Sequence, residues 1–159
     1  MSEKFQTLLS EYSESHENET NKLIHWICVP LIFWSIVALL YSIPNVPLVA
    51  MFADTLFSNW AVILMIPVLI YYISLSLSIG IGMMFFIGIC LILSFMMNQN
   101  SNYPLWAIAV LIFLLAWLGQ FYGHKVEGKK PSFLKDIQYL LIGPPWLLHF
   151  IFKKIGIKY

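Results

Sequence analysis

Residues 60–97 decide the fold; they read WAVILMIPVLIYYISLSLSIGIGMMFFIGICLILSFMM and contain no charged side chain. One helix needs about 20 apolar residues to cross a bilayer, and this run is roughly twice that length. Small and polar residues gather near its middle: Ser74, Ser76, Ser78, Gly80 and Gly82. The pattern predicts two membrane-spanning helices, at 60–78 and 80–97, joined by a tight turn. The same small residues also allow helices to pack closely in lipid.

Two further apolar segments flank this pair. The first, at 25–43, stops at prolines, and the mixed stretch 44–59 that follows is interpreted as an external loop. A short polar loop at 98–104 precedes the other segment, at 105–122. Each is close to the length of one membrane span. The sequence therefore predicts four transmembrane helices in an all-α integral membrane bundle.

The composition supports lipid as the solvent of this chain. Of its 159 residues 60% are hydrophobic and only 11% are charged, and the formal net charge is +1. Soluble proteins carry about 25% charged residues. A soluble domain, a disordered chain and a nucleic-acid binder are thereby excluded. The two cysteines, Cys28 and Cys90, lie far apart in apolar runs and form neither a disulfide framework nor a zinc pattern.

The segments at the two ends of the chain are not predicted to be ordinary membrane spans. Residues 1–22 are polar and begin acidic, unlike a signal peptide. Apolar residues recur in this stretch at helical spacing, which predicts an amphipathic helix; they are Phe5, Leu8, Leu9 and Tyr12. Within 134–155, the apolar run 137–152 is interpreted as broken by Gly143, Pro144 and Pro145. It is short for a span, so a re-entrant or interfacial helical segment is expected.

The basic residues predict the topology. All nine are lysines, and none lies between residues 23 and 124. Four spans place both termini on one side of the membrane, and the positive-inside bias makes that side cytoplasmic. The expected location is a bacterial inner membrane, or the endoplasmic reticulum membrane if the chain is eukaryotic.

The four histidines, His16, His25, His124 and His149, all fall near this same interface in the four-span arrangement. Histidine is the commonest nitrogen ligand of zinc and iron, so a shared metal site is one interpretation. Hydrogen-bonded anchors at the interface are the other. His16 and His25 are nine residues apart and would face opposite sides of one helix. They can share a metal only if the chain bends between them, and the helix-capping residues Asn18, Thr20 and Asn21 favour such a break.

Glu127 lies three residues after His124, on the same face of a continuing helix. The pair can supply a nitrogen and a carboxylate to a metal, or Glu127 can pair with Lys129 or Lys130 in solvent. Gly128 predicts that the helix ends there.

Two sequence blocks resemble a known family. The first is Tyr12-x3-His16-x4-Asn21-x3-His25-x4-Pro30, and the second is QFYGHKVEGKKPSFLKDIQYLLIGPPWLLHF, over residues 120–150. Together they resemble the Mpo-like family of membrane proteins, and the resemblance covers nearly the whole chain. The characterised fungal member of that family is a dioxygenase of the endoplasmic reticulum membrane. It requires ferrous iron and shortens 2-hydroxy fatty acids by one carbon.

The resemblance implies an iron-dependent dioxygenase of fatty acid alpha-oxidation, with Fe(II) as cofactor and a 2-hydroxy fatty acid, dioxygen and membrane lipid as partners. The family histidines correspond to His16, His25 and His124, and His149 joins them as a candidate ligand by its place in the same layer. Tyr12 and Asn21 are expected to orient the histidines, because each precedes one of them by four residues.

Lysines near the site have two interpretations. Lys125 and Lys129 are candidates to attract the substrate carboxylate, although topology and anionic lipid also explain them. Two other functions use the same features. One is a zinc-dependent membrane lipid hydrolase or hydroxylase, since zinc accepts the same ligands; the other is a non-enzymatic membrane protein.

Overall fold

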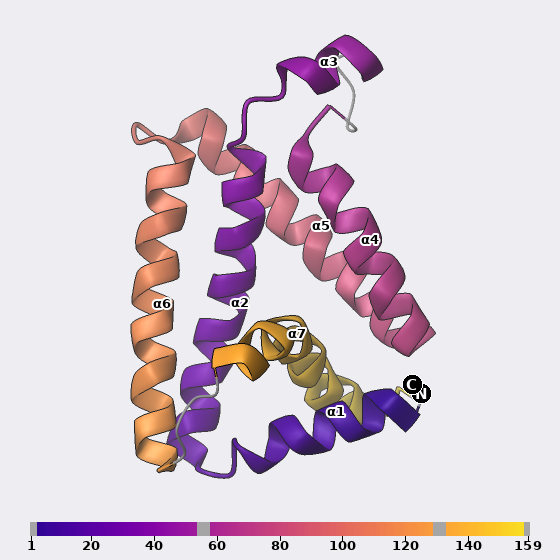
Figure 1. Ribbon diagram of the computed structural model, residues 1–159, viewed down its shortest axis with the longest axis vertical. Helices are drawn as coiled ribbons and strands as arrows, with labels where there is room; N and C mark the ends of the chain where they lie inside the picture. The colour runs from indigo at the N-terminus through magenta and orange to yellow at the C-terminus, as the bar shows by residue number, and fades with distance from the viewer. Residues whose placement is uncertain (1–2, 54–57, 129–132, 158–159) are drawn as a thin grey trace.

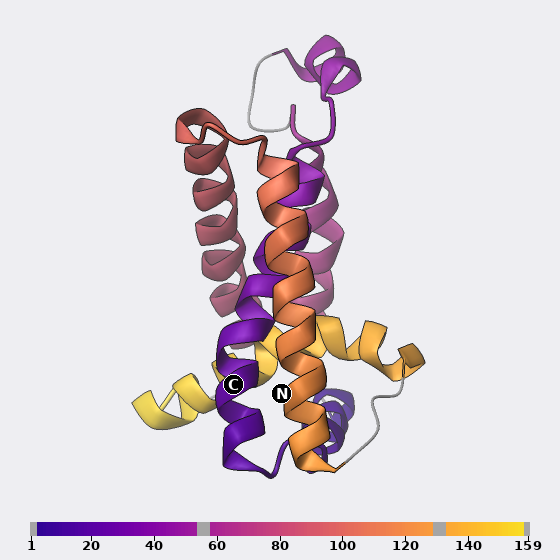
Figure 2. The same cartoon turned by 90° about the vertical axis from the view of Figure 1, so that its left-hand side faces the viewer.

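The computed structural model describes residues 3–53, 58–128 and 133–157 (Figure 1). Helices and their connections make up these residues, with no strand among them, so the predicted all-α fold is confirmed. The helices are α1 (Glu3–Glu14), α2 (Glu19–Tyr41), α3 (Val46–Phe52), α4 (Trp60–Leu75), α5 (Leu77–Asn100), α6 (Leu105–Glu127) and α7 (Phe133–Ile155). Helices α2, α4, α5 and α6 form the bundle. Helices α1 and α7 lie across one end of it, as Figures 1 and 2 together show.

Three of the bundle helices, α2, α5 and α6, are long and apolar enough to cross a membrane. Helix α4 is also apolar but has 16 residues, about 24 Å of helix, so it is shorter than a typical hydrocarbon core. The bundle exposes large apolar side chains outward, such as Ile70, Phe85 and Leu118, each more than 60% exposed. Such a surface suits lipid, and the predicted membrane helical bundle is the fold observed.

The predicted turn within residues 60–97 is confirmed, and it falls at Ser76. Helix α4 ends at Leu75 and α5 begins at Leu77, because Ser76 has an extended backbone (φ −164°, ψ 133°). Gly80 lies against α4: a Cβ at this position would be 2.9 Å from Cα of Ile73. The small residues therefore serve both the turn and the close packing of the two helices.

Helices α2 and α6 form the most extensive helix pair of the bundle. Two glycines four residues apart, Gly119 and Gly123, face α2 from α6. A Cβ on Gly119 would lie 2.7 Å from Sγ of Cys28, and a Cβ on Gly123 would overlap the side chain of Asn21. This is the small-residue spacing that lets two helix backbones approach closely in lipid. Cys28 is buried at this contact.

Helix α1 is the amphipathic helix predicted at the N-terminus. Its apolar residues are all buried: Phe5, Leu8, Leu9 and Tyr12. They pack in one cluster with residues of α7, among them the fully buried Trp146. The Trp146 indole Nε1 donates a hydrogen bond to Oγ of Ser13 (3.0 Å), which fixes α1 against α7.

Helix α7 is continuous, so the expected break at Gly143, Pro144 and Pro145 is wrong. Proline at 145 lacks the N–H that would bond the carbonyl of Leu141 one turn earlier. The hydroxyl of Tyr72 on α4 donates to this carbonyl instead (2.8 Å). A partner from another helix therefore supplies the missing hydrogen bond, as in proline-containing membrane helices. The interfacial placement of this segment remains a prediction.

The segment 44–59 also differs from its interpretation as a loop, because it contains the short helix α3. Pro47 lies in the first turn of α3, where a missing N–H has no intrahelical partner to lose. Hydrogen bonds from Asn45 Nδ2 to the Ser58 carbonyl (2.7 Å) and from Trp60 Nε1 to the Pro44 carbonyl (3.1 Å) connect the two ends of the segment.

Replacing Tyr72 by phenylalanine is expected to destabilise the fold by about 0.5–1.5 kcal/mol, because the part-buried carbonyl of Leu141 then loses this hydrogen bond. Thermal unfolding in detergent measures the change. Tyr71→Phe is the control, since it removes the same atom from the neighbouring position on α4. Equal melting temperatures for the two variants would show that the Tyr72 hydroxyl does not support α7.

Candidate metal centre

The turn between α1 and α2 brings the first two histidines together. Oδ1 of Asn18 accepts hydrogen bonds from the backbone N–H groups of Thr20 (2.9 Å) and Asn21 (3.3 Å), and so caps α2. The predicted break in the chain is confirmed, with α2 beginning at Glu19. His16 lies before the break and His25 lies in the second turn of α2. They can therefore converge although they are nine residues apart.

Three of the four histidines, His16, His25 and His124, form one cluster. Each offers a ring nitrogen, and these three donor atoms all lie within 4.8 Å of one another. The ring centroids are 4.2 Å apart for His16 and His25, and 5.0 Å for His25 and His124. His16 and His25 are 2% and 1% exposed, and His124 is half-buried. Such a spacing of imidazole nitrogens suits a single transition-metal ion.

Backbone carbonyls fix the tautomers of two of these rings. Nδ1 of His16 lies 2.6 Å from the carbonyl oxygen of Tyr12, and Nδ1 of His25 lies 2.9 Å from that of Asn21. A carbonyl can only accept, so each Nδ1 carries the hydrogen and Nε2 is the basic nitrogen. Metal-binding histidines almost always donate their other N–H in this way. The donor set therefore fits a metal that prefers imidazole, such as iron or zinc.

Tyr12 and Asn21, the residues expected to orient histidines, both contact them. The ring of Tyr12 stacks on that of His16, with 4.2 Å between centroids and 11° between planes. The carbonyl groups of Tyr12 and Asn21 make the hydrogen bonds described above, while the Asn21 side chain points to the α1–α2 turn. The chain thus holds two rings by main-chain atoms as well as by packing.

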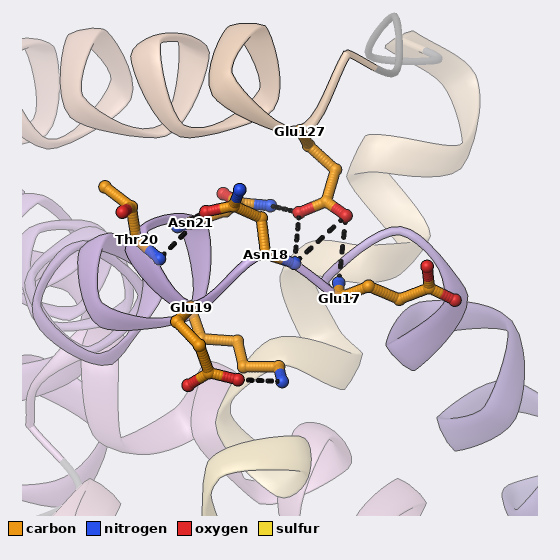
Figure 3. A network of polar contacts seen from close by, with 7 residues as sticks. Glu17, Asn18, Glu19, Thr20, Asn21 and Glu127 are labelled. Atoms are coloured by element: carbon orange, nitrogen blue, oxygen red, sulfur yellow. Dashed lines mark hydrogen bonds and ion pairs between the residues drawn. The ribbon is translucent and has the colours of Figure 1, made fainter.

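Glu127, the candidate carboxylate ligand, is engaged elsewhere (Figure 3). Its carboxylate accepts hydrogen bonds from the backbone N–H groups of Glu17 (2.9 Å) and Asn18 (3.0 Å) and from Nδ2 of Asn21 (2.9 Å). It is not among the donors of the histidine cluster in the described part of the chain. The predicted end of the helix is confirmed, because Gly128 caps α6 in the left-handed conformation (φ 74°).

His149 lies on α7, outside the cluster of three that the described residues form. It lines a cavity of about 560 Å³ that also reaches His16. The lining residues are Ser10, Ser13, Glu14, His16, Glu17, Lys22, Trp146, His149 and Phe150. Burial, together with the nearby Lys153 ammonium, lowers the pKa of His149 below its usual value. His149 therefore lines the cavity outside the cluster, and its role as a ligand remains a prediction.

The lysine that lies near the candidate site is not one of those expected from the sequence. Lys125 is exposed in the last turn of α6, and Lys129 lies outside the described residues. Lys22, for which no role was predicted, lines the cavity and pairs with Glu19 (2.7 Å). One signal pointed to it, since Lys22 precedes His25 by three residues and so shares its side of a helix. Ser13 and Trp146 also line this cavity, but their sequence positions did not indicate a place in the site.

The fold and the cluster together define a helical membrane protein that gathers three imidazole side chains, a candidate metal site, at one end of its bundle. The sequence matches the family described as 2-hydroxy-palmitic acid dioxygenase Mpo1-like over residues 2–77 and 78–155, and the chain belongs to that family. No curated protein and no solved structure matches it.

Proposed function

We propose that the chain is an Fe(II)-dependent dioxygenase that shortens 2-hydroxy fatty acids by one carbon, with His16, His25 and His124 holding the metal. One observation carries the proposal: three imidazole donors from separate segments converge within 4.8 Å in a member of this family. When bound, ferrous iron would supply open positions for a chelating 2-hydroxy acid and for dioxygen. The protein's part is to orient the rings through the carbonyls of Tyr12 and Asn21.

The cavity beside His16 suits the polar head of such a substrate. Its volume of about 560 Å³ lies in the range of small-molecule sites. Lys22 supplies a cation for the carboxylate, and Ser13 supplies a hydroxyl. Trp146 and Phe150 supply an apolar wall for the first carbons of the chain. The remaining tail can lie in lipid, because the neighbouring face of α2 exposes apolar side chains such as Leu23 and Ile27.

Two substitutions in the ion pair of Lys22 and Glu19 are expected to have opposite effects on substrate affinity. Lys22→Met removes the cation and is expected to raise KM for a 2-hydroxy fatty acid about tenfold, with kcat little changed, since a charged hydrogen bond contributes about 1.5–3 kcal/mol. Glu19→Gln releases Lys22 from its ion pair and is expected to lower KM about twofold, because exposed pairs of this kind are weak. Oxygen-uptake kinetics in detergent measure both.

Lys125→Met is the matched control for Lys22→Met, because it removes the same charge from an exposed position outside the cavity lining. An equal rise of KM in both variants would mean that general charge attraction, and not the cavity, recognises the carboxylate.

The experiment that tests the proposed function measures metal content and oxygen dependence together. Detergent-purified protein is expected to contain iron, and to consume oxygen in step with the loss of a 2-hydroxy fatty acid and the appearance of the acid one carbon shorter. Removal of oxygen is expected to stop turnover. Turnover that continues without oxygen would contradict the proposal.

A zinc-dependent membrane lipid hydrolase is the second candidate, and one observation favours it. The cluster in the described residues consists of nitrogen donors alone, as in catalytic zinc sites with three histidines. Zinc in the purified protein, with hydrolysis of a lipid ester in the absence of oxygen, would decide for this alternative.

A further inference from the structure

One carboxylate connects the three segments that carry the clustered histidines. Glu127 stands at the end of α6, and its two oxygens accept hydrogen bonds from residues 106 to 110 positions earlier in the chain (Figure 3). We infer that Glu127 is a positioning residue whose carboxylate clasps the α1–α2 turn to α6, and thereby holds His16, His25 and His124 at metal-binding spacing. We call this set of hydrogen bonds from Glu17, Asn18 and Asn21 to Glu127 the clasp.

The clasp reaches His25 through Asn21. The side chain of Asn21 is fully buried, and its Nδ2 donates both to Glu127 Oε2 (2.9 Å) and to the carbonyl of Ser15 (3.3 Å). The carbonyl of the same Asn21 bonds Nδ1 of His25. A shift of Asn21 therefore moves the atom that orients the His25 ring.

The clasp reaches His16 through the main chain. The two backbone N–H groups that bond Glu127 belong to Glu17 and Asn18, which directly follow His16. Asn18 is also the capping residue of α2, so the carboxylate lies at the N-terminus of that helix. A negative charge is favoured there, because unpaired N–H groups and the helix dipole make this end positive. The negative charge of Glu127 therefore stabilises the turn next to His16.

The clasp is tied to His124 by sequence and by packing. Glu127 follows His124 by three residues on α6, and Gly123 leaves the space in which Asn21 lies. Closing the clasp and binding a metal require the same arrangement of α1, α2 and α6. Two events that favour one arrangement strengthen each other. The inference rests on the metal centre of the proposed function, but neither on the identity of the metal nor on the reaction.

Cobalt titration of the metal-free protein in detergent tests the clasp without any turnover. Co²⁺ suits an imidazole site and reports binding through its visible absorption. Glu127→Ala is expected to weaken Co²⁺ affinity about 10- to 100-fold, the range found when residues that orient metal ligands are replaced. Glu127→Gln, which keeps the shape but loses the charge, is expected to have a smaller effect.

Glu17→Gln is the matched control. It removes one negative charge from the α1–α2 turn to which Glu127 bonds. The Glu17 backbone N–H still donates to Glu127, and Figure 3 shows the Glu17 carboxylate pointing away from the clasp. Its Co²⁺ affinity is expected to equal that of the wild type. An equal loss in Glu17→Gln and Glu127→Gln would reduce the effect to net charge and overturn the inference.

The melting temperatures of the metal-free variants show whether Glu127 positions the histidines or only stabilises the fold. A Glu127→Ala protein that melts lower yet binds Co²⁺ as tightly as the wild type would overturn the inference and leave the proposed function intact. A wild-type protein that binds no Co²⁺ would overturn the metal centre itself, and the clasp with it.

Discussion

Replacing His25 by alanine is expected to remove bound metal from the purified protein and, with it, oxygen consumption. His25 is 1% exposed and stands in the middle of the cluster, within ring contact of both His16 and His124. Its loss leaves two imidazoles from separate segments. Affinity is expected to fall by more than the roughly 100-fold found at most for residues that only orient ligands. Metal analysis after dialysis against a weak chelator measures the loss.

His149→Ala is the control for this result. His149 lines the cavity but lies outside the cluster of three, so this variant is expected to keep its metal while its substrate affinity falls. Equal loss of metal from both variants would mean that the centre has four histidine ligands, as the sequence alone suggested. Full metal content in His25→Ala would instead rule out the cluster as the centre.

The sequence predicted those features that depend on neighbours along the chain. The apolar spacing of Phe5, Leu8, Leu9 and Tyr12 identified α1 and the face that it buries. The capping residues Asn18, Thr20 and Asn21 predicted the break before α2, where Asn18 is the cap, and Gly128 predicted the end of α6. Each of these depends on a helical period or a cap, and both are local properties.

Features that depend on distant partners were not predictable in this way. The prolines of α7 were interpreted as a break, because nothing near them in sequence shows that Tyr72 on α4 donates a hydrogen bond to the carbonyl of Leu141. Glu127 was placed beside His124 by spacing alone, and it was expected either to bind a metal with His124 or to pair with Lys129 or Lys130. Its observed donors, residues 17, 18 and 21, lie at the other end of the chain. A single sequence does not contain this pairing.

The α2–α6 contact lies between these two cases. The spacing Gly119-x3-Gly123 is visible in the sequence and is typical of close helix pairs in membranes, but it does not say which helix approaches. The structure supplies the partner, α2, and places the close approach next to the histidine cluster, because Asn21 occupies the space above Gly123.

Gly123→Ala is therefore expected to damage stability and metal binding together. A Cβ at this position would overlap Oδ1 of Asn21 and lie 3.5 Å from Cγ2 of Ile24, so α2 and α6 must separate or Asn21 must move. Forcing an extra carbon into a tight contact costs about 1–3 kcal/mol. A moved Asn21 also releases Glu127 and the carbonyl that orients His25. Thermal unfolding and Co²⁺ titration in detergent measure the two effects.

Gly88→Ala provides the matched comparison, because a Cβ there meets nothing within 4 Å and α5 continues through this position. Alanine is the better helix former by about 1 kcal/mol, so this variant is expected to melt at or above the wild-type temperature with unchanged Co²⁺ affinity. A Gly123→Ala protein that melts and binds Co²⁺ like Gly88→Ala would show that α2 and α6 tolerate a wider spacing. In that case the histidine spacing does not depend on the close approach at Gly123.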